Sequence, residues 1–263
     1  MLGEFVLPSG GSAWTQNLLQ LLDELEVKEK AGRQAIARMH EGGWLDRERV
    51  GRQTRWSLTP ESRRVLEEGA ARIYGFGTAA PAWDGSWAVV IASVPEADRH
   101  LRYRMGVGLR WVGFGSLGQG VWVCPWAERD AEAAALLGSL GVEAMSFRGP
   151  LGELGTGTDV AQQAWDLDEL RAAYDAFLPV DSDAPEAAEG VRAAARLTRL
   201  VHRWRRFPGI DPELPDALLP VDWPGRAAAE RFAAERRRLL DPALRWWQVV
   251  ESGAGPTKES NGR

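Results

Sequence analysis

Apolar residues recur at helical spacing near the start of the chain. Between residues 14 and 25 the leucines fall on one side, which predicts an amphipathic helix with Ser12 as its N-cap. A second helix is predicted over 28–41, where Gly32 and Ile36 share an apolar face. The opposite face of that helix is polar and carries Lys30, Arg33, Gln34 and Arg38.

Alternation replaces helical spacing after Gly42-Gly43. Residues 44–58 alternate on both sides of a tight turn at 50–53, which predicts a β-hairpin. Thr59 and Pro60 then open another helix as N-cap and first helical residue. The order helix, helix, hairpin, helix is typical of a winged helix-turn-helix, which we place at residues 1–75. The predicted hairpin carries the basic residues Arg49, Arg52 and Arg55.

The pattern in the middle of the chain predicts a βαββαβ order. It has a strand at 87–94, a helix at 96–109, two short strands within 111–125, a helix at 128–140 and a closing strand at 142–147. We therefore expect a ferredoxin-like domain over residues 76–180, with both helices on one face of the sheet. The glycines between 113 and 120 lie between two strands, so we interpret them as turn residues and not as a phosphate-binding loop.

The last part of the chain is predicted to be a helical domain over residues 181–250. It begins with an acidic loop at 181–189 and ends in a helix at about 225–239, and residues 251–263 form a tail of disordered composition. A helix at 190–206 buries an apolar face that includes Trp204. Its other face carries a row of arginines at helical spacing, Arg192, Arg196, Arg199 and Arg203.

Composition narrows the class of protein. The 263 residues are 44% hydrophobic and 26% charged, and no apolar run is long enough to cross a bilayer, so we expect a soluble, cytoplasmic globular protein without a membrane partner. One cysteine and three separated histidines give no disulfide and no zinc spacing, so we expect no metal and no cofactor. The 13 tryptophans indicate aromatic clusters in the core or a surface for a flat ligand.

Charge adds the first functional signal. The chain has a net charge of -5, yet residues 28–64 hold ten basic and five acidic side chains. A basic stretch in an acidic protein favours a polyanion as partner. We expect Lys30, Arg33 and Gln34 in the major groove of double-stranded DNA, with Arg38 at a phosphate or the groove edge. The three hairpin arginines are predicted to lie on phosphates or in the minor groove, although a merely solvated hairpin is the alternative.

Several longer motifs resemble one known family. These are Gly3-Glu-Phe-Val-Leu-Pro8, Trp56-Ser-Leu-Thr-Pro60, the 115–123 hairpin, Leu200-Val-His-Arg-Trp-Arg-Arg-Phe-Pro208 and Leu218-Leu-Pro-Val-Asp-Trp-Pro-Gly225. They are similar to the PaaX family, the transcriptional repressors of phenylacetic-acid catabolism, and the resemblance covers nearly the whole chain. This chain departs from the family pattern at two places. Gly32 stands where a β-branched residue is common in the family, and the first helix of the chain is expected to be shorter than is usual in the family.

The resemblance implies more than the residues do. It implies an α+β multidomain protein with an N-terminal winged helix-turn-helix, a central Cas2-like ferredoxin fold and a helical C-terminal domain. It also implies a homodimer on an inverted-repeat operator that an aryl-CoA thioester such as phenylacetyl-CoA releases.

An effector site is predicted between the central and C-terminal domains, because the C-terminal third offers phosphate-binding arginines near aromatic rings. The predicted ligand residues are Arg192, Arg196, Arg199, Arg203, Trp204 and Trp223. For each of them a plain structural role is the alternative.

A non-enzymatic regulator is therefore the leading hypothesis. A Cas2-like metal-dependent nuclease is one alternative, but Ser93-Val94-Pro95 stands where its carboxylates would cluster at the end of the first central strand. A protein-interaction module is the other.

Overall fold

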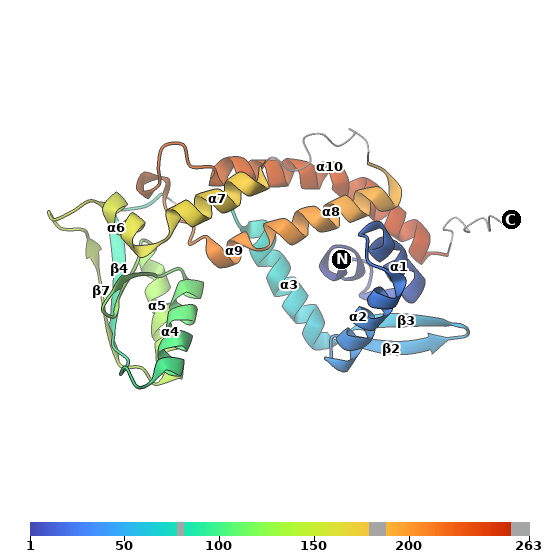
Figure 1. The fold of residues 1–263 in the computed structure, drawn as a ribbon, viewed down its shortest axis with the longest axis horizontal. Coiled ribbons are helices and arrows are strands. Elements are labelled where there is room, and N and C mark those ends of the chain that lie inside the picture. The colour runs from blue at the N-terminus through green and yellow to red at the C-terminus, as the bar shows by residue number, and fades with distance from the viewer. Residues whose placement is uncertain (78–81, 179–187, 254–263) are drawn as a thin grey trace. The chain divides into compact units, whose positions relative to one another are not determined.

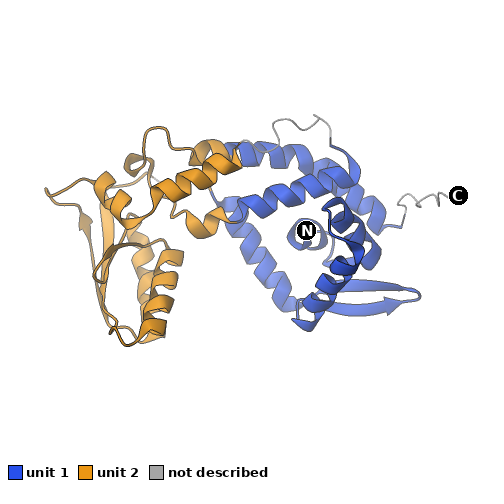
Figure 2. Cartoon of the chain, in the orientation of Figure 1, with its two compact units in different colours: residues 1–76, 181–205, 230–263 blue, residues 77–180, 206–229 orange. Residues whose placement is uncertain are grey.

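The computed structural model describes residues 1–77, 82–178 and 188–253, which form two compact units. Unit 1 comprises residues 1–76, 181–205 and 230–263, and unit 2 comprises residues 77–180 and 206–229 (Figure 2). The C-terminal third is thus shared between the units, whereas the sequence predicts one helical domain over residues 181–250. The predicted acidic loop and tail lie largely outside the described residues.

Unit 1 combines a small sheet with helices from both ends of the chain (Figure 1). The strands pair antiparallel in the order β1-β3-β2. The elements are a π-helical turn at Leu2–Val6, β1 (Ser12–Trp14), α1 (Thr15–Glu24), α2 (Glu29–Glu41), β2 (Leu45–Val50), β3 (Gln53–Leu58), α3 (Pro60–Gly75), α8 (Gly190–Trp204) and the greater part of α10 (Gly225–Glu251).

Local chemistry explains the ends of these elements. The Thr59 hydroxyl accepts the backbone N–H of Ser62, and Pro60 fills the first helical position of α3, as the sequence predicts. The hairpin turns where Val50 pairs with Gln53, and Gly51 there has a φ of 60°, in the left-handed region that glycine tolerates.

The role predicted for Ser12 is wrong. Trp14 occupies the N-cap position of α1, and Ser12 belongs to strand β1, where it pairs with Ser57 of β3. The Ser12 hydroxyl accepts a hydrogen bond from Nε of Arg55, at 2.9 Å. A three-residue strand carries too little periodicity to be recognised from sequence, because its pairing with β3 defines it.

Aromatic rings from distant segments form the core of unit 1. Trp204 of α8 is fully buried, stacks on Phe232 of α10 at 4.6 Å between ring centroids, and meets Phe76 edge-on at 5.6 Å. Its indole N–H donates to the carbonyl oxygen of Ile73, at 3.2 Å. At the other end of α10, Trp247 is also fully buried and packs against Phe5.

The last helix extends well beyond its predicted end at 239. Helix α10 continues through Pro242 to Glu251. A proline inside a helix removes one backbone hydrogen bond, which is why the sequence indicates an end there. Burial of Ala243, Trp247 and Val250 on one face supplies the packing that maintains the helix beyond that point.

Unit 2 contains the predicted βαββαβ order. Its strands pair antiparallel in the order β5-β6-β4-β7. The elements are β4 (Ser86–Ala92), α4 (Arg99–Val112), β5 (Gly115–Gly118), β6 (Val121–Cys124), α5 (Asp130–Leu140) and β7 (Ala144–Pro150), followed by α6 (Gly157–Ala164), α7 (Leu167–Phe177) and the short α9 (Phe207–Ile210). Gly118 and Gly120 take left-handed φ values at the turn between β5 and β6, so they are turn glycines as predicted. The turn role predicted for the other two glycines is wrong, because Gly113 caps the end of α4 and Gly115 is the first residue of β5.

The two faces of this sheet are covered differently. Helices α4 and α5 lie on one face (Figure 1), where Met105, Leu109 and Leu137 pack on the strands. On the other face Trp87 and Val123 pack against residues that follow β7, including Ala161 and Leu214. Ile91, Met145 and Phe147 also project from β4 and β7, and they remain 39%, 61% and 58% exposed.

A buried polar pair fixes the segment that follows α8. The Tyr174 hydroxyl of α7 donates to a carboxylate oxygen of Asp211, and the Tyr174 ring stacks on Phe207 at 4.3 Å. Burial raises the pKa of Asp211 above its ordinary value, because the ionised carboxylate loses its hydration. The hydrogen bond offsets part of that cost.

One buried side chain joins the two ends of the chain in unit 1. Nδ2 of Asn17 on α1 donates to the carbonyl oxygen of Val250 at 3.0 Å and to the Glu251 carboxylate at 2.8 Å. The same carboxylate accepts the backbone N–H of Trp14, at 3.2 Å. Hydrogen-bonding groups at helix ends often lack partners within their own helix. Here the acceptors at the end of α10, in Val250 and Glu251, bind donors of Trp14 and Asn17 at the start of α1.

We predict that Asn17→Ala lowers the free energy of unfolding of unit 1 by about 1–3 kcal/mol, because it removes the two hydrogen bonds that the buried Asn17 side chain donates to Val250 and Glu251. Urea denaturation followed by circular dichroism measures this. Gln20→Ala is the matched control on the exposed face of α1 and should change stability by less than about 0.5 kcal/mol. Equal stability of the two variants would contradict the role assigned to Asn17.

Candidate nucleic-acid interface

Helix α2 presents its polar face to solvent. Lys30, Arg33, Gln34 and Arg38 are all exposed, whereas Gly32 and Ile36 are buried on the opposite side. This is the division of faces that the sequence predicts. The ring of His40 fixes the end of the helix, because its Nδ1 lies 2.6 Å from the carbonyl oxygen of Leu45 and donates to it.

Gly32 permits the close approach of α2 to α1. A Cβ atom at this position would lie 2.9 Å from Leu19 Cδ2 and 3.1 Å from Leu22 Cδ1, closer than ordinary van der Waals contact. A β-branched residue here would therefore require these leucines or the helix to shift. The departure from the family pattern is explained by this packing, which offsets the low helix propensity of glycine.

Arg33 has an ionic partner on its own helix. Its guanidinium lies 2.7 Å from a carboxylate oxygen of Glu29, and both side chains are more than half exposed. Surface pairs at this spacing contribute only about 0.3–0.5 kcal/mol. Arg33 can therefore exchange Glu29 for a base edge or a phosphate at small cost.

The hairpin presents Arg49 and Arg52 at its tip. Every residue of β2 after Leu45 is exposed, and Figure 1 shows the β2–β3 hairpin projecting from the rest of unit 1. Arg52 lies in the turn, and Nε of Arg49 donates to the carbonyl oxygen of Gly51 at 3.3 Å. Both guanidinium groups are thus accessible on a narrow projection.

Arg55 lies in a different environment. It is half-buried, donates to Ser12, and places its guanidinium carbon 5.1 Å from the centre of the Trp14 ring. These contacts connect β3 to β1, so Arg55 has a structural role that its sequence pattern does not predict. The partners of Arg55, Ser12 and Trp14, both belong to β1, and this three-residue strand cannot be recognised from the sequence. The predicted contact of Arg55 with DNA stays a prediction.

The structure distributes the predicted effector residues over different environments. Arg192 is exposed, Arg196 and Arg203 are half-buried, and Arg199 donates to the Glu24 carbonyl oxygen at 3.0 Å. Trp204 is a core residue of unit 1. Trp223 belongs to unit 2, where Arg171 lies over its ring at 5.4 Å.

The described residues offer little for metal or thiol chemistry. Among them, no group of three or more His, Cys, Asp or Glu side chains is arranged to hold a metal ion. Burial raises the pKa of the Cys124 thiol to about 11, so this side chain stays protonated at neutral pH. Within the described ranges, no helix is long and apolar enough to span a membrane.

The helices and sheets of the two units define a mixed α+β protein of several domains, which carries a basic surface on α2 and the β2–β3 hairpin. Comparison with known proteins identifies its family. Residues 1–62 match the family described as PaaX-like protein, residues 80–160 match the PaaX protein central Cas2-like domain, and residues 165–249 match the PaaX-like protein C-terminal domain. The chain belongs to the PaaX family, as its motifs predict. The Cas2-like assignment of the central domain is confirmed as well.

Two relatives extend over most of the chain. The transcriptional repressor PaaX of Escherichia coli (strain K12) is 29% identical over 96% of this chain and 82% of its own length. The uncharacterized protein Rv0674 from Mycobacterium tuberculosis is 26% identical, covers 87% of this chain and 90% of its own, and superposes with a TM-score of 0.57. The likeness to a repressor confirms that the chain is a regulator and not an enzyme.

Proposed function

We propose that this chain is a DNA-binding transcriptional repressor of an aromatic-acid catabolic operon of the phenylacetate type. The observation that carries the proposal is the exposed basic surface formed by the polar face of α2 and the tip of the β2–β3 hairpin in the PaaX-like segment. The similarity to the transcriptional repressor PaaX supports the direction of control and the pathway.

In this proposal residues 1–75 act as a winged helix-turn-helix. Helix α2 enters the major groove, where Arg33, Gln34 and Lys30 reach base edges and Arg38 reaches a phosphate. The hairpin is the wing, and Arg49 and Arg52 lie on phosphates or in the minor groove. Arg55 joins them only if it leaves Ser12 and Trp14.

The alternatives are less well supported. A metal-dependent nuclease requires clustered carboxylates in the Cas2-like domain, and Ser93-Val94-Pro95 follows β4 at the place where they are expected. A protein-interaction module would bind no DNA, whereas the exposed α2 face has the side chains that read bases and phosphates.

We predict that Arg33→Ala weakens specific binding by about 1–3 kcal/mol, because a bidentate contact to a base is lost. Fluorescence anisotropy with a duplex from the upstream region of the chain's own gene measures the affinity. Arg64→Ala is a matched control, since Arg64 forms a similarly exposed pair with Glu68 at 2.8 Å on α3. Equal losses in both variants would contradict a recognition role for α2.

A homodimer on a palindromic operator is part of the proposal. Two recognition helices about 34 Å apart would read two half-sites one helical turn apart. The apolar side chains Ile91, Met145 and Phe147 offer a surface for a second copy, because Met145 pairs with Ile91 across β4 and β7 and Phe147 lies on the same face.

We therefore expect a dimer in sedimentation at micromolar concentration, and a monomer when Met145→Glu and Phe147→Glu are combined. Charge at an apolar contact remains unpaired and opposes association. Leu154→Glu, at a residue that is 93% exposed, is the control and should leave the dimer intact. A strictly monomeric protein with and without DNA would contradict the dimer, and a dimer unaffected by the double change would contradict this surface.

Release of the operator by an aryl-CoA thioester completes the proposal. The predicted site uses the arginine row of α8, in which Arg192 is exposed and Arg199 donates one hydrogen bond to a backbone carbonyl and lies 3.9 Å from the exposed Glu26 carboxylate. These groups retain donors for ligand phosphates. Trp204 contributes to such a site through the core beneath α8, since its own ring is fully buried.

We expect phenylacetyl-CoA to release the labelled operator duplex in the anisotropy assay, and free phenylacetate to leave it bound. Replacing Arg196 and Arg199 together by alanine should abolish the response, because the thioester's phosphates lose their partners. Arg237→Ala, on the exposed part of α10, is the control and should respond normally. A response that is unchanged in the double variant would remove the effector from α8.

A further inference from the structure

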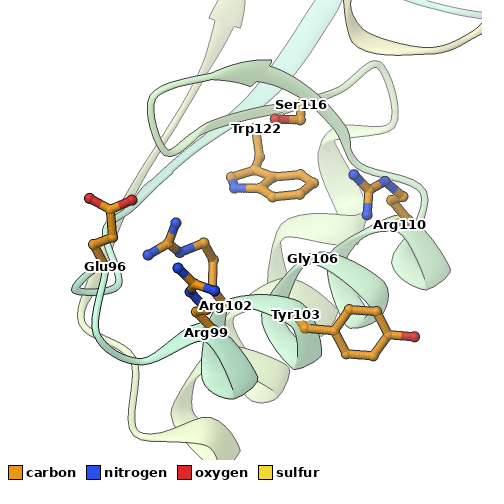
Figure 3. Close-up of a pocket in the computed structure, with 8 residues that line it drawn as sticks. All are labelled: Glu96, Arg99, Arg102, Tyr103, Gly106, Arg110, Ser116 and Trp122. Carbon is orange, nitrogen blue, oxygen red and sulfur yellow. The ribbon is translucent and has the colours of Figure 1, made fainter.

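Unit 2 contains a pocket that the proposed function does not use. It has a volume of about 550 Å³ and lies between α4 and the β5–β6 hairpin (Figure 3). A pocket of roughly 300–1,000 Å³ suits a small molecule. The residues that line it are Glu96, Arg99, Arg102, Tyr103, Gly106, Arg110, Ser116 and Trp122.

The pocket concentrates positive charge in an acidic part of the chain. Residues 79–180 contain seven basic and 13 acidic side chains, yet four of the seven basic ones lie on α4. Three of these four, Arg99, Arg102 and Arg110, line the pocket. No salt bridge between described residues involves any of the three, and Arg102 donates to the carbonyl oxygen of Pro95 at 3.2 Å.

Trp122 provides a rigid wall and an unused donor. The residue is only 6% exposed, and the Arg110 guanidinium carbon lies 5.5 Å from its ring centre. Its indole nitrogen is buried without a hydrogen-bond partner among the described residues, which costs free energy unless an acceptor reaches it. In Figure 3 this nitrogen lies at the end of the indole nearer Arg99 and Arg102.

Gly106 keeps the floor of the pocket open. A Cβ atom there would already contact the Trp122 ring at 3.5 Å and Arg110 at 3.4 Å, so a longer side chain would fill the space between them. The first turn of α4 adds the partial positive charge of a helix N-terminus on the same side as Arg99 and Arg102.

We propose that this pocket binds a small ligand that carries a phosphate group. The guanidinium groups of Arg99 and Arg102 lie near each other (Figure 3) and form no salt bridge with a described residue. They match the oxygens of a phosphate ester, which arginine binds through two hydrogen bonds at a time. Ser116 and the indole N–H supply further donors. Glu96 at the rim accepts from a hydroxyl group on the ligand, which distinguishes a phosphorylated small molecule from bare phosphate.

The concave shape favours a small molecule over DNA. The phosphates of a duplex run along its outside and are met by projecting side chains, as on α2 and the hairpin. The pocket instead places Arg99 and Arg102 together at one end of the Trp122 indole and Arg110 at the other (Figure 3). The proposal is independent of the proposed repressor function, since every residue that carries it lies in unit 2.

Isothermal titration calorimetry of the full chain with inorganic pyrophosphate, without DNA, tests the proposal. We expect saturable binding that becomes on the order of 100-fold weaker in the double variant Arg99→Gln/Arg102→Gln, at a factor of about ten for each charge-assisted bond lost. Arg104→Gln is the matched control, because Arg104 is exposed on α4 but does not line the pocket. If the double variant does not fold, as judged by circular dichroism, Arg99→Gln alone takes its place.

Two further titrations distinguish a small phosphate ligand from the phosphates of DNA, and distinguish this pocket from the proposed DNA-binding surface. Arg33→Ala should bind pyrophosphate normally, so a failure of DNA binding would leave this result intact. A duplex should bind with the same affinity to the wild-type chain and to the double variant. No saturable pyrophosphate binding, equal losses in the double variant and in Arg104→Gln, or a loss seen only with the duplex would each overturn the proposal.

Discussion

The packing of the last helix against the first residues of the chain is the constraint on which unit 1 depends. Asn17 connects α1 to the final turn of α10, and Phe5 packs on Trp247 near the same end. Farther along, Trp204 and Phe232 hold the end of α3 through Phe76 and the carbonyl of Ile73. The small sheet and helices α1 to α3 contain few fully buried large side chains of their own, so the C-terminal helices complete their core.

This constraint bears on the proposed DNA contacts. A recognition helix discriminates between bases only if its position is held within a fraction of an ångström. Helix α2 is held by α1 through the close contact at Gly32, and α1 is held by α8 and α10. A ligand that altered the packing of α8 would therefore shift α1, and α1 would shift α2, all within the same unit. These two helix contacts are a physical route by which a ligand could release the operator.

The sequence predicts those elements whose signal is local. Thr59-Pro60 marks the start of α3, the Gly51 turn marks the hairpin, and the spacing of Gly32 and Ile36 gives the exposed face of α2. The sequence does not predict elements whose formation depends on contacts with residues far along the chain. Strand β1 exists because it pairs with β3, and α10 passes Pro242 because Trp247 and Val250 are buried. Asn17 looks like any polar residue on a helix until Val250 is placed beside it.

The exposed face of α2 and the arginines of α4 that line the pocket show that function, too, cannot be predicted from local sequence alone. Both lie on helices of an acidic protein, and in the sequence the arginines of α4 look as solvated as those of α2. The difference lies in what surrounds them. On α2 they project from a convex face, with Glu29 as a weak partner for Arg33, which suits the outside of a duplex. On α4 they line a pocket beside a buried indole, with Arg99 and Arg102 together at one end of it (Figure 3), a geometry that suits the phosphate group of a small molecule. Shape and not charge therefore separates the two proposed ligands.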